Sequence, residues 1–360
     1  MRLILQNVII TALTASALST AISPATQTGL TDRTAMRVDS LLARFDEPGS
    51  PGVAVAVLSR GHVVYMRGHG LANLEYCVPI TPETIFNVAS VSKQVTAFSI
   101  VLLTQQGELD LDEDIRTYLP ELPDFGEIVT LRHLIHHTSG LRGILNSLTI
   151  AGWQEGDVVT KKQITRMIRS QRELNYKPGD EYLYVNTGYV LIVEIVERVT
   201  GQPFDEWTKT HIFAPLDMND TVFCSDFEQV IPNRAYSYHE SERDGGTFKK
   251  SVSNINLVGP SGLYTTAADL VKWIQNFDDA RVGGRCTIEQ MHVRGTLNNG
   301  DTLSYAYGLI INEYRGLKRI SHEGSIAGFR SCVARFPDQA LAVIVLSNVA
   351  STDIGRLTNQ

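Results

Sequence analysis

The chain has 360 residues, of which 43% are hydrophobic and 20% charged, and its formal net charge at pH 7 is −7. This composition is typical of a globular protein and excludes a wholly disordered chain or a fibrous repeat. Nucleic-acid partners are not expected, because no basic run is present and such proteins concentrate Lys and Arg on one face. The length exceeds what one hydrophobic core usually supports, so we expect two lobes with a cleft between them.

The first 25 residues resemble a secretory signal peptide. Arg2 provides a positive start, and an apolar stretch follows, interrupted by Gln6 and Asn7 and ending in small residues near position 21. The alternative is a frayed amphipathic segment. No later stretch is long and apolar enough to span a bilayer. We therefore expect an exported protein, secreted or periplasmic, whose folded domain occupies residues 30–360.

Strands are expected near the N-terminus, after a helix at residues 34–45 that has apolar residues at helical spacing. Residues 52–58, 62–67 and 71–77 are β-rich runs separated by short glycine-containing turns, and they predict an antiparallel meander. A helix is then expected at residues 90–106, with Gly107 as its C-terminal cap.

The middle of the chain is richer in helices, whereas strands return near the C-terminus. The expected fold class is therefore α/β (α+β), with an antiparallel sheet built from both chain ends, flanking helices and an inserted helical lobe. The sheet lobe would comprise about 34–85 and 280–360, and the helical lobe about 90–278. Helices are expected at 131–136, 161–170, 189–199, 204–212 and 267–276, strands at 306–312, 317–322, 329–336 and 341–347, and the start of a helix at 353–358.

Ser90 and Lys93 form the first candidate for chemistry, because residues three apart on a helix lie on the same face. A serine hydroxyl needs a base to become a good nucleophile, and a lysine can serve if burial lowers its pKa. Taken alone, the pair could equally be an N-cap serine and a surface lysine. However, no other serine of the chain has a lysine at this spacing, and residues 84–89 are apolar enough to bury the helix start.

Tyr184 and Asn186 are the second candidate, in a segment that follows a Pro-Gly turn and precedes a helix. A phenol can pass protons between a nucleophile and a leaving group, and an amide can hold a substrate carbonyl. The alternative is a packed tyrosine beside a helix-capping asparagine.

His322 and Gly324 are the third candidate, expected at the end of a late strand. Strand alternation directs both to one face and Glu323 to the other, so we assign Glu323 no catalytic role. We expect Gly324 to let substrate backbone approach closely. The backbone N–H of Ser325 would join that of Ser90 in an oxyanion hole. The alternative is a strand-end histidine beside a turn glycine.

These three elements, in this order, resemble the penicillin-recognising serine hydrolases, which include class C β-lactamases, D-alanyl-D-alanine carboxypeptidases, D-aminopeptidases and related esterases. The likeness covers about residues 38–350 and extends to segments 81–87, 134–141 and 261–270. It implies a β-lactamase/transpeptidase-like fold. It also implies that Ser90 is acylated, that Lys93 accepts its proton, that Tyr184 shuttles protons and that Asn186 orients the substrate.

His322 would stand where many members of this family have lysine. A histidine is largely neutral near pH 7 and offers no permanent cation to the carboxylate of a β-lactam. The resemblance therefore implies a peptidase or esterase acting on a small molecule or short peptide, possibly ending in a D-amino acid. A β-lactamase, an acyl receptor that binds penicillin without turnover, and a degenerate binding scaffold are the alternatives.

Neither a metal nor a cofactor is expected. His133, His136 and His137 cluster in the sequence but lack the glutamate of a zinc-protease motif, and no Gly-x-Ser-x-Gly elbow of an α/β-hydrolase is present. Export would permit disulfides, but the sequence does not determine whether the scattered cysteines pair or remain isolated thiols. It also leaves the oligomeric state unknown. The cysteines are Cys77, Cys224, Cys286 and Cys332.

Overall fold

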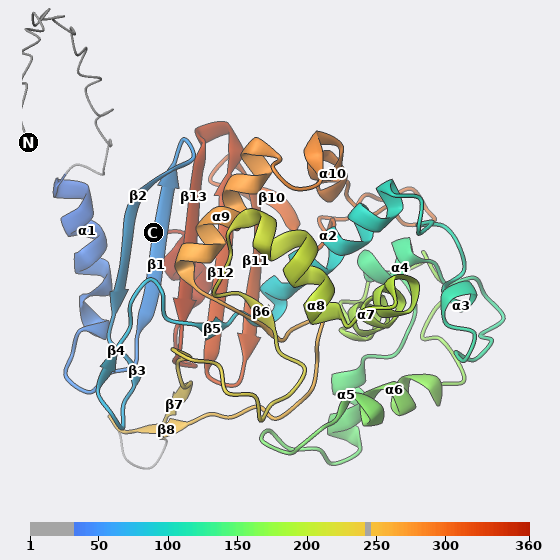
Figure 1. The fold of residues 1–360 in the computed structure, drawn as a ribbon, viewed down its shortest axis with the longest axis horizontal. Coiled ribbons are helices and arrows are strands. Elements are labelled where there is room, and N and C mark those ends of the chain that lie inside the picture. The colour runs from blue at the N-terminus through green and yellow to red at the C-terminus, as the bar shows by residue number, and fades with distance from the viewer. Residues whose placement is uncertain (1–31, 242–245) are drawn as a thin grey trace, which may run out of the picture.

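The computed structural model describes residues 32–241 and 246–360 (Figure 1). The predicted signal peptide lies outside the described residues. A six-stranded antiparallel sheet has the order β10-β11-β12-β13-β1-β2, and β1 pairs with β13, so the two ends of the chain share one sheet. This confirms the predicted fold class. The strands are β1 Val53–Ser59, β2 His62–His69, β10 Ile310–Tyr314, β11 Leu317–Ile326, β12 Phe329–Phe336 and β13 Leu341–Ser347.

Two hairpins of this sheet close through short turns with left-handed backbone. Arg60 and Gly61 join β1 to β2 with φ of 52° and 76°, and Arg315 and Gly316 join β10 to β11 with φ of 53° and 75°. Positive φ at both central residues matches the right-handed twist of the flanking strands. The glycines that mark these turns in the sequence therefore fix where the strands begin and end.

Alternating side chains of β1 face two different layers of helices. Ala54 and Ala56 pack in the main core with α2 (Ser92–Gln105) and α9 (Ala267–Asp279). Val53 and Val55 pack in a second cluster with α1 (Asp32–Leu42) and α11 (Ile354–Thr358). Both faces of the sheet are thus covered, which explains why β1 and β13 are apolar on both sides.

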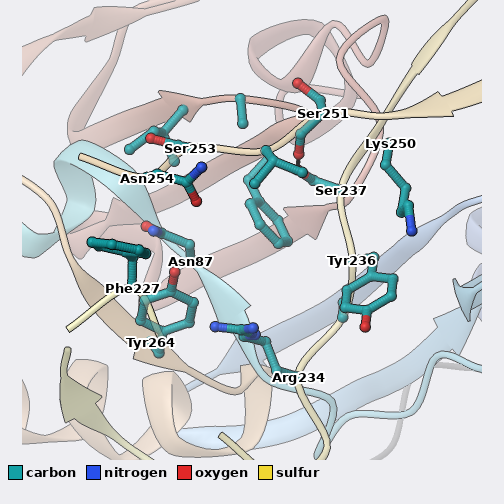
Figure 2. A pocket seen from close by; sticks show the side chains of 15 residues that line it. Asn87, Phe227, Arg234, Tyr236, Ser237, Lys250, Ser251, Ser253, Asn254 and Tyr264 are labelled. Carbon is teal, nitrogen blue, oxygen red and sulfur yellow. Dashed lines mark hydrogen bonds between the residues drawn. The ribbon is translucent and has the colours of Figure 1, made fainter. Parts of the chain in front are cut away.

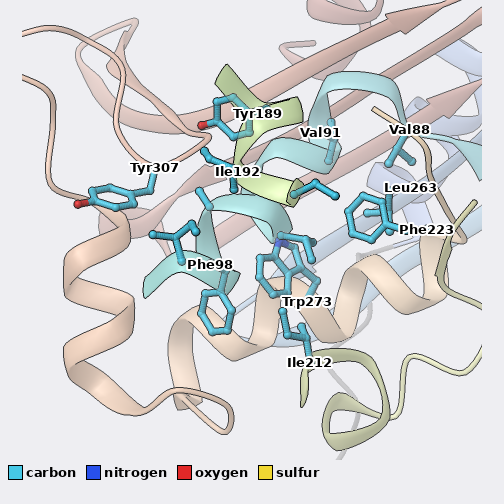
Figure 3. Packing of buried hydrophobic residues seen from close by; sticks show 14 of the residues in the cluster. Val88, Val91, Phe98, Tyr189, Ile192, Ile212, Phe223, Leu263, Trp273 and Tyr307 are labelled. Carbon is cyan, nitrogen blue, oxygen red and sulfur yellow. The ribbon is translucent and has the colours of Figure 1, made fainter. Parts of the chain in front are cut away.

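The main core surrounds α2 and holds the start of that helix in place (Figure 3). Phe98 of α2 meets Trp273 of α9 edge-on, with 5.2 Å between ring centroids. Val88 and Val91, on either side of Ser90, are almost completely buried. Further helices pack around this core: α3 Ile115–Tyr118, α4 Leu131–Ile135, α5 Ile144–Ile150, α6 Lys161–Arg169, α7 Thr187–Thr200, α8 Phe204–Thr208 and α10 Gly284–Met291. The division into two lobes stays a prediction from the sequence.

Small sheets connect the core to the segments that precede Ser90. β5 (Phe86–Asn87) pairs with β9 (Leu263–Thr265), which also pairs with β6 (Val222–Phe223). A separate hairpin consists of β7 (Tyr238–Glu240) and β8 (Phe248–Lys250). The chain therefore enters the Ser90 region from a short, paired strand.

Several predicted elements were wrong in detail. Residues 71–77 do not continue the meander, because Gly70, with φ of 77°, turns the chain away and β3 (Leu71–Asn73) pairs with β4 (Val78–Pro79) instead. The strand expected at 306–312 begins only at Ile310, after Gly308 packs against the backbone of Lys93. The helix expected at 204–212 ends at Thr208 and continues as a wide π turn.

Gly324 in β11 packs against the turn that contains Ser90. A Cβ at this position would lie 2.3 Å from the Val88 carbonyl oxygen and 2.4 Å from Ser331 Oγ. We had expected this glycine to allow substrate to approach, but the space beside it is taken by the chain itself. The glycine is needed for internal packing.

Gly324→Ala should therefore lower the free energy of unfolding by about 1–3 kcal/mol, because both contacted groups are held by the surrounding structure. Urea denaturation measures this change. Gly355→Ala is the control, since its Cβ would meet only the exposed carboxylate of Glu323, at 3.0 Å, and alanine favours a helix. Equal stability of the Gly324→Ala variant and the wild type would contradict the packing role.

Candidate active site

Ser90 lies in a 3₁₀ turn, Ala89–Val91, directly before α2. Ala89 has φ of 47°, in the left-handed region, which an alanine adopts only when its surroundings enforce it. The backbone N–H of Ala89 donates to Asn87 Oδ1 at 2.9 Å, and Ser331 Oγ donates to the Val88 carbonyl at 2.7 Å. The turn is thus fixed by hydrogen bonds on both sides.

Lys93 is fully buried one turn further along, and its amine reaches Ser90. Nζ lies 3.0 Å from Ser90 Oγ and 2.9 Å from the Pro260 carbonyl oxygen. No described acidic side chain pairs with it, and burial lowers its pKa well below the ordinary value. A neutral amine can donate to the Pro260 carbonyl and accept the Ser90 hydroxyl hydrogen with its lone pair. The arrangement can therefore take a proton from Ser90.

Aromatic rings surround the lysine amine. Nζ lies 4.8 Å from the ring centroid of Tyr184 and 5.6 Å from that of Tyr189. These rings do not neutralise the amine, but their faces attract a cation. They would stabilise Lys93 after it has gained a proton, without holding it protonated beforehand as a carboxylate would.

Tyr184 brings a phenol to the same serine. Burial raises the pKa of its phenol above the ordinary value, and the nearby Ser90 side chain lowers it in part. The phenol is therefore protonated at neutral pH and can act as a donor. Its ring lies against His137, with 4.3 Å between ring centroids.

His137 positions the segment that contains Tyr184. The N–H of Val185 donates to His137 Nδ1 at 3.3 Å, and the N–H of Leu183 donates to the His137 carbonyl at 2.9 Å. Burial, and repulsion from Lys93 and His322 whenever either is protonated, lower the pKa of His137 well below its usual range. We assigned His137 no role at the site from the sequence, because nothing local distinguishes it from its neighbours in a histidine-rich segment.

His322 lies in the middle of β11, not at a strand end as predicted, and is only 3% exposed. Its Nδ1 lies 2.7 Å from the Glu323 carbonyl oxygen, and its Nε2 lies 3.0 Å from the Tyr305 hydroxyl. Since a carbonyl can only accept, Nδ1 bears the hydrogen and Nε2 accepts from Tyr305. Both ring nitrogens are thus used by the protein.

The charge of His322 follows from the same surroundings. Burial, and repulsion from Lys93 whenever its amine is protonated, lower the pKa of His322 to about 3. The imidazole is neutral at physiological pH, as we predicted because histidine, unlike lysine, is largely uncharged near pH 7. Tyr305 was missed from the sequence, since its pairing with His322 spans 17 residues and no local pattern marks it.

A pocket of about 340 Å³ opens beside Ser90. Ser90, Asn186 and Ser325 line it together, so three of the predicted site residues meet there. Asn186 Oδ1 is buried without a hydrogen-bond partner among the described residues. That oxygen is available to a ligand. Apolar side chains cover much of the remaining wall: Leu145, Trp153, Ile255 and Leu257.

Metal binding has no support in the described part of the chain. There, no group of three or more His, Cys, Asp and Glu side chains could hold a metal ion. His133 accepts the N–H of Thr130, and His136 contacts the carbonyls of Arg132 and Val293.

All four cysteines lie within the described residues as free thiols. In residues 32–241 and 246–360, no helix has the length and apolarity needed to cross a membrane.

Comparisons with known proteins match this fold and sequence. The family model described as Beta-lactamase matches residues 38–359. A D-aminopeptidase of Gluconobacter oxydans is 33% identical over 86% of this chain and 58% of its own length. Penicillin-binding protein 4* of Bacillus subtilis is 28% identical over 80% of this chain and 66% of its own length. The chain thus spans less than two thirds of the length of these relatives.

Among solved structures, the octameric penicillin-binding protein homologue from Pyrococcus abyssi superposes with a TM-score of 0.79. It is 27% identical, and the match covers 91% of this chain and 76% of the other. The likeness includes the antiparallel sheet and the helices packed on it, so the fold of this chain is one already seen in proteins of that kind.

The buried amine of Lys93 has a consequence for stability. Its folded pKa lies below the unfolded value of 10.5, so between the two the unfolded state binds one more proton. The buried amine therefore destabilises the folded state below pH 10.5, and this destabilisation becomes smaller as the pH rises towards 10.5. Between pH 7 and 9.5 the wild type should gain up to about 1.4 kcal/mol per pH unit relative to Lys93→Met.

Urea denaturation at both pH values measures this difference. Lys162→Met removes an exposed lysine of α6 and serves as the matched control, which should follow the wild type. A difference between wild type and Lys93→Met that does not change with pH would mean that Lys93 is an ordinary cation.

Proposed function

This chain belongs to the beta-lactamase family, and we propose that it is a serine hydrolase that acts through an ester formed on Ser90. One observation carries the proposal: the buried Lys93 amine lies 3.0 Å from Ser90 Oγ, and its one other hydrogen bond among the described residues is to the Pro260 carbonyl. A base of this kind is what a serine needs to attack a carbonyl.

In the first step, Lys93 takes the Ser90 proton as Oγ attacks the carbonyl carbon of the substrate. The negative oxygen that forms would be held by the backbone N–H groups of Ser90 and Ser325, both of which line the pocket. The new positive charge on Lys93 faces the rings of Tyr184 and Tyr189.

In the second step, the proton passes from Lys93 through the Tyr184 hydroxyl to the leaving amine or alcohol, and the carbon–nitrogen or carbon–oxygen bond breaks. Water then attacks the ester on Ser90, and the proton of the water passes through Tyr184 and Lys93 to Ser90 Oγ. The product acid leaves, and the Ser90 hydroxyl is restored. Tyr184 suits this transfer because burial keeps its phenol protonated and its ring centroid lies 4.8 Å from Lys93 Nζ.

We propose small amides and esters as substrates, including short peptides with a D-amino acid. The apolar side chains of the pocket, whose wall also contains Glu155, suit an uncharged part of the acyl group. Asn186 Oδ1 can accept a substrate N–H. The similar D-aminopeptidase supports the same class. β-Lactam hydrolysis is less favoured, since His322 is neutral and both its nitrogens are occupied.

Ser90→Ala should abolish labelling by a fluorophosphonate and lower the hydrolysis of D-alanyl 4-nitroanilide by at least about a thousandfold. Mass spectrometry of the labelled protein identifies the modified residue, and absorbance follows the release of nitroaniline. Nitrocefin, penicillin and the L-alanyl anilide distinguish the other substrate classes.

Ser99→Ala is the matched control, because this buried serine of α2 bonds only to the carbonyl one turn back. It should be labelled like the wild type. Unchanged turnover by Ser90→Ala would overturn the mechanism, and a lasting penicillin adduct without turnover would favour an acyl receptor.

We also propose that the protein is exported, on the signal-peptide pattern of residues 1–25. Expression of the full chain in a bacterium with a periplasm should yield a mature form that lacks this segment. The intact mass of the protein from the periplasmic fraction checks this. A full-length product confined to the cytoplasm would contradict export.

A further inference from the structure

A second pocket, of about 270 Å³, lies next to the one that contains Ser90 (Figure 2). Ser253, Ile326 and Ala327 line both pockets, so a molecule bound at Ser90 can extend from one into the other. The walls of the second pocket contain several polar and charged side chains. They include Arg234, Tyr236, Ser251, Asn254 and Tyr264.

Arg234 gives this pocket a positive charge that no described group neutralises. No acidic side chain of the described residues lines the pocket, and none forms an ion pair with Arg234. The other cation, Lys250, is already paired with Glu75 at 3.0 Å. Arg234 is therefore the cation that remains for a ligand.

The guanidinium of Arg234 is held in place by an aromatic ring. It lies over Tyr264, 5.7 Å from the ring centroid, and Figure 2 shows it directed toward that ring. Burial raises the pKa of the Tyr264 phenol, and the nearby side chains of Asn87 and Arg234 lower it in part. A guanidinium held against a ring keeps its planar set of donors ready for a ligand.

The same residues connect the pocket to Ser90. Asn87 accepts the backbone N–H of Ala89, the residue before Ser90, at 2.9 Å. The backbone on either side of Arg234 pairs with Ile85: the N–H of Ile85 donates to Asn233 at 3.0 Å, and the N–H of Ala235 donates to Ile85 at 2.9 Å. The position of Arg234 relative to the nucleophile is therefore fixed by short backbone contacts.

We propose that the Arg234 pocket binds a carboxylate of the substrate whose carbonyl group is attacked by Ser90. This rests on the proposed hydrolase function and narrows its substrates to amides or esters with an acidic end. One planar guanidinium matches a planar carboxylate through paired hydrogen bonds. A phosphate dianion would need a second available cation, and Lys250 is engaged.

Two matched pairs of esters test the proposal. The first is 4-nitrophenyl glutarate against its methyl ester, which puts the charge on the acyl group. The second is 3-acetoxybenzoate against its methyl ester, which puts the charge on the leaving group. In the wild type, kcat/KM should favour the acid over the neutral ester in at least one pair.

Arg234→Gln should lower that ratio by about 10- to 100-fold, the loss expected for a charged hydrogen bond. Arg234→Lys keeps the charge without the planar donors and should retain part of the preference. Lys250→Gln is the matched control, and it should change the ratio less than about twofold because its ammonium is exposed and already paired. Thermal unfolding of each variant verifies that it is folded.

An unchanged ratio in both pairs for folded Arg234→Gln would overturn the carboxylate subsite, as would an equal loss with Lys250→Gln. The proposed function fails by a different result: ester hydrolysis that is absent in the wild type or that persists in Ser90→Ala. Ser90-dependent hydrolysis without an Arg234-dependent preference would leave the function standing and remove only the subsite.

Discussion

The burial of one amine beside one hydroxyl, without a carboxylate, is the constraint on which the rest of the site depends. A lysine paired with an acid would be a fixed cation and could not take a proton from Ser90. Here Lys93 contacts Ser90 Oγ and the Pro260 carbonyl, and burial alone lowers its pKa. The cost of burying the amine opposes folding, and the packed core around α2 offsets it.

The surroundings of this amine follow from the same constraint. Tyr184 is protonated and His322 is neutral, so neither adds a permanent charge to the described surroundings of Lys93. A negative group of the substrate therefore meets a neutral imidazole at His322 and not a cation. In our account, the carboxylate of the substrate is bound instead by Arg234, which lies beyond the hairpin residues Ile326 and Ala327. Proton transfer at Lys93 and binding of the substrate carboxylate at Arg234 therefore take place at different positions.

Local patterns in the sequence predicted much of the molecule. Glycine turns and apolar runs located most strands of the large sheet, and spacing along one helix brought Ser90 and Lys93 together. Interactions between distant segments were beyond such patterns. The Pro260 carbonyl, the phenol of Tyr305 and the imidazole of His137 reach the site only through tertiary packing. For the same reason, the packing of Gly324 against Val88 could not be distinguished from a role in substrate contact.

The protonation state of Lys93 is the most direct measure of this account. NMR of the protein with ¹³C at the lysine ε carbons, with the Lys93 signal assigned from its loss in a Lys93→Gln variant, follows the titration of the amine itself. The account predicts a Lys93 signal that titrates well below the ordinary lysine value of 10.5. Titration near 10.5, together with the other lysines, would contradict it.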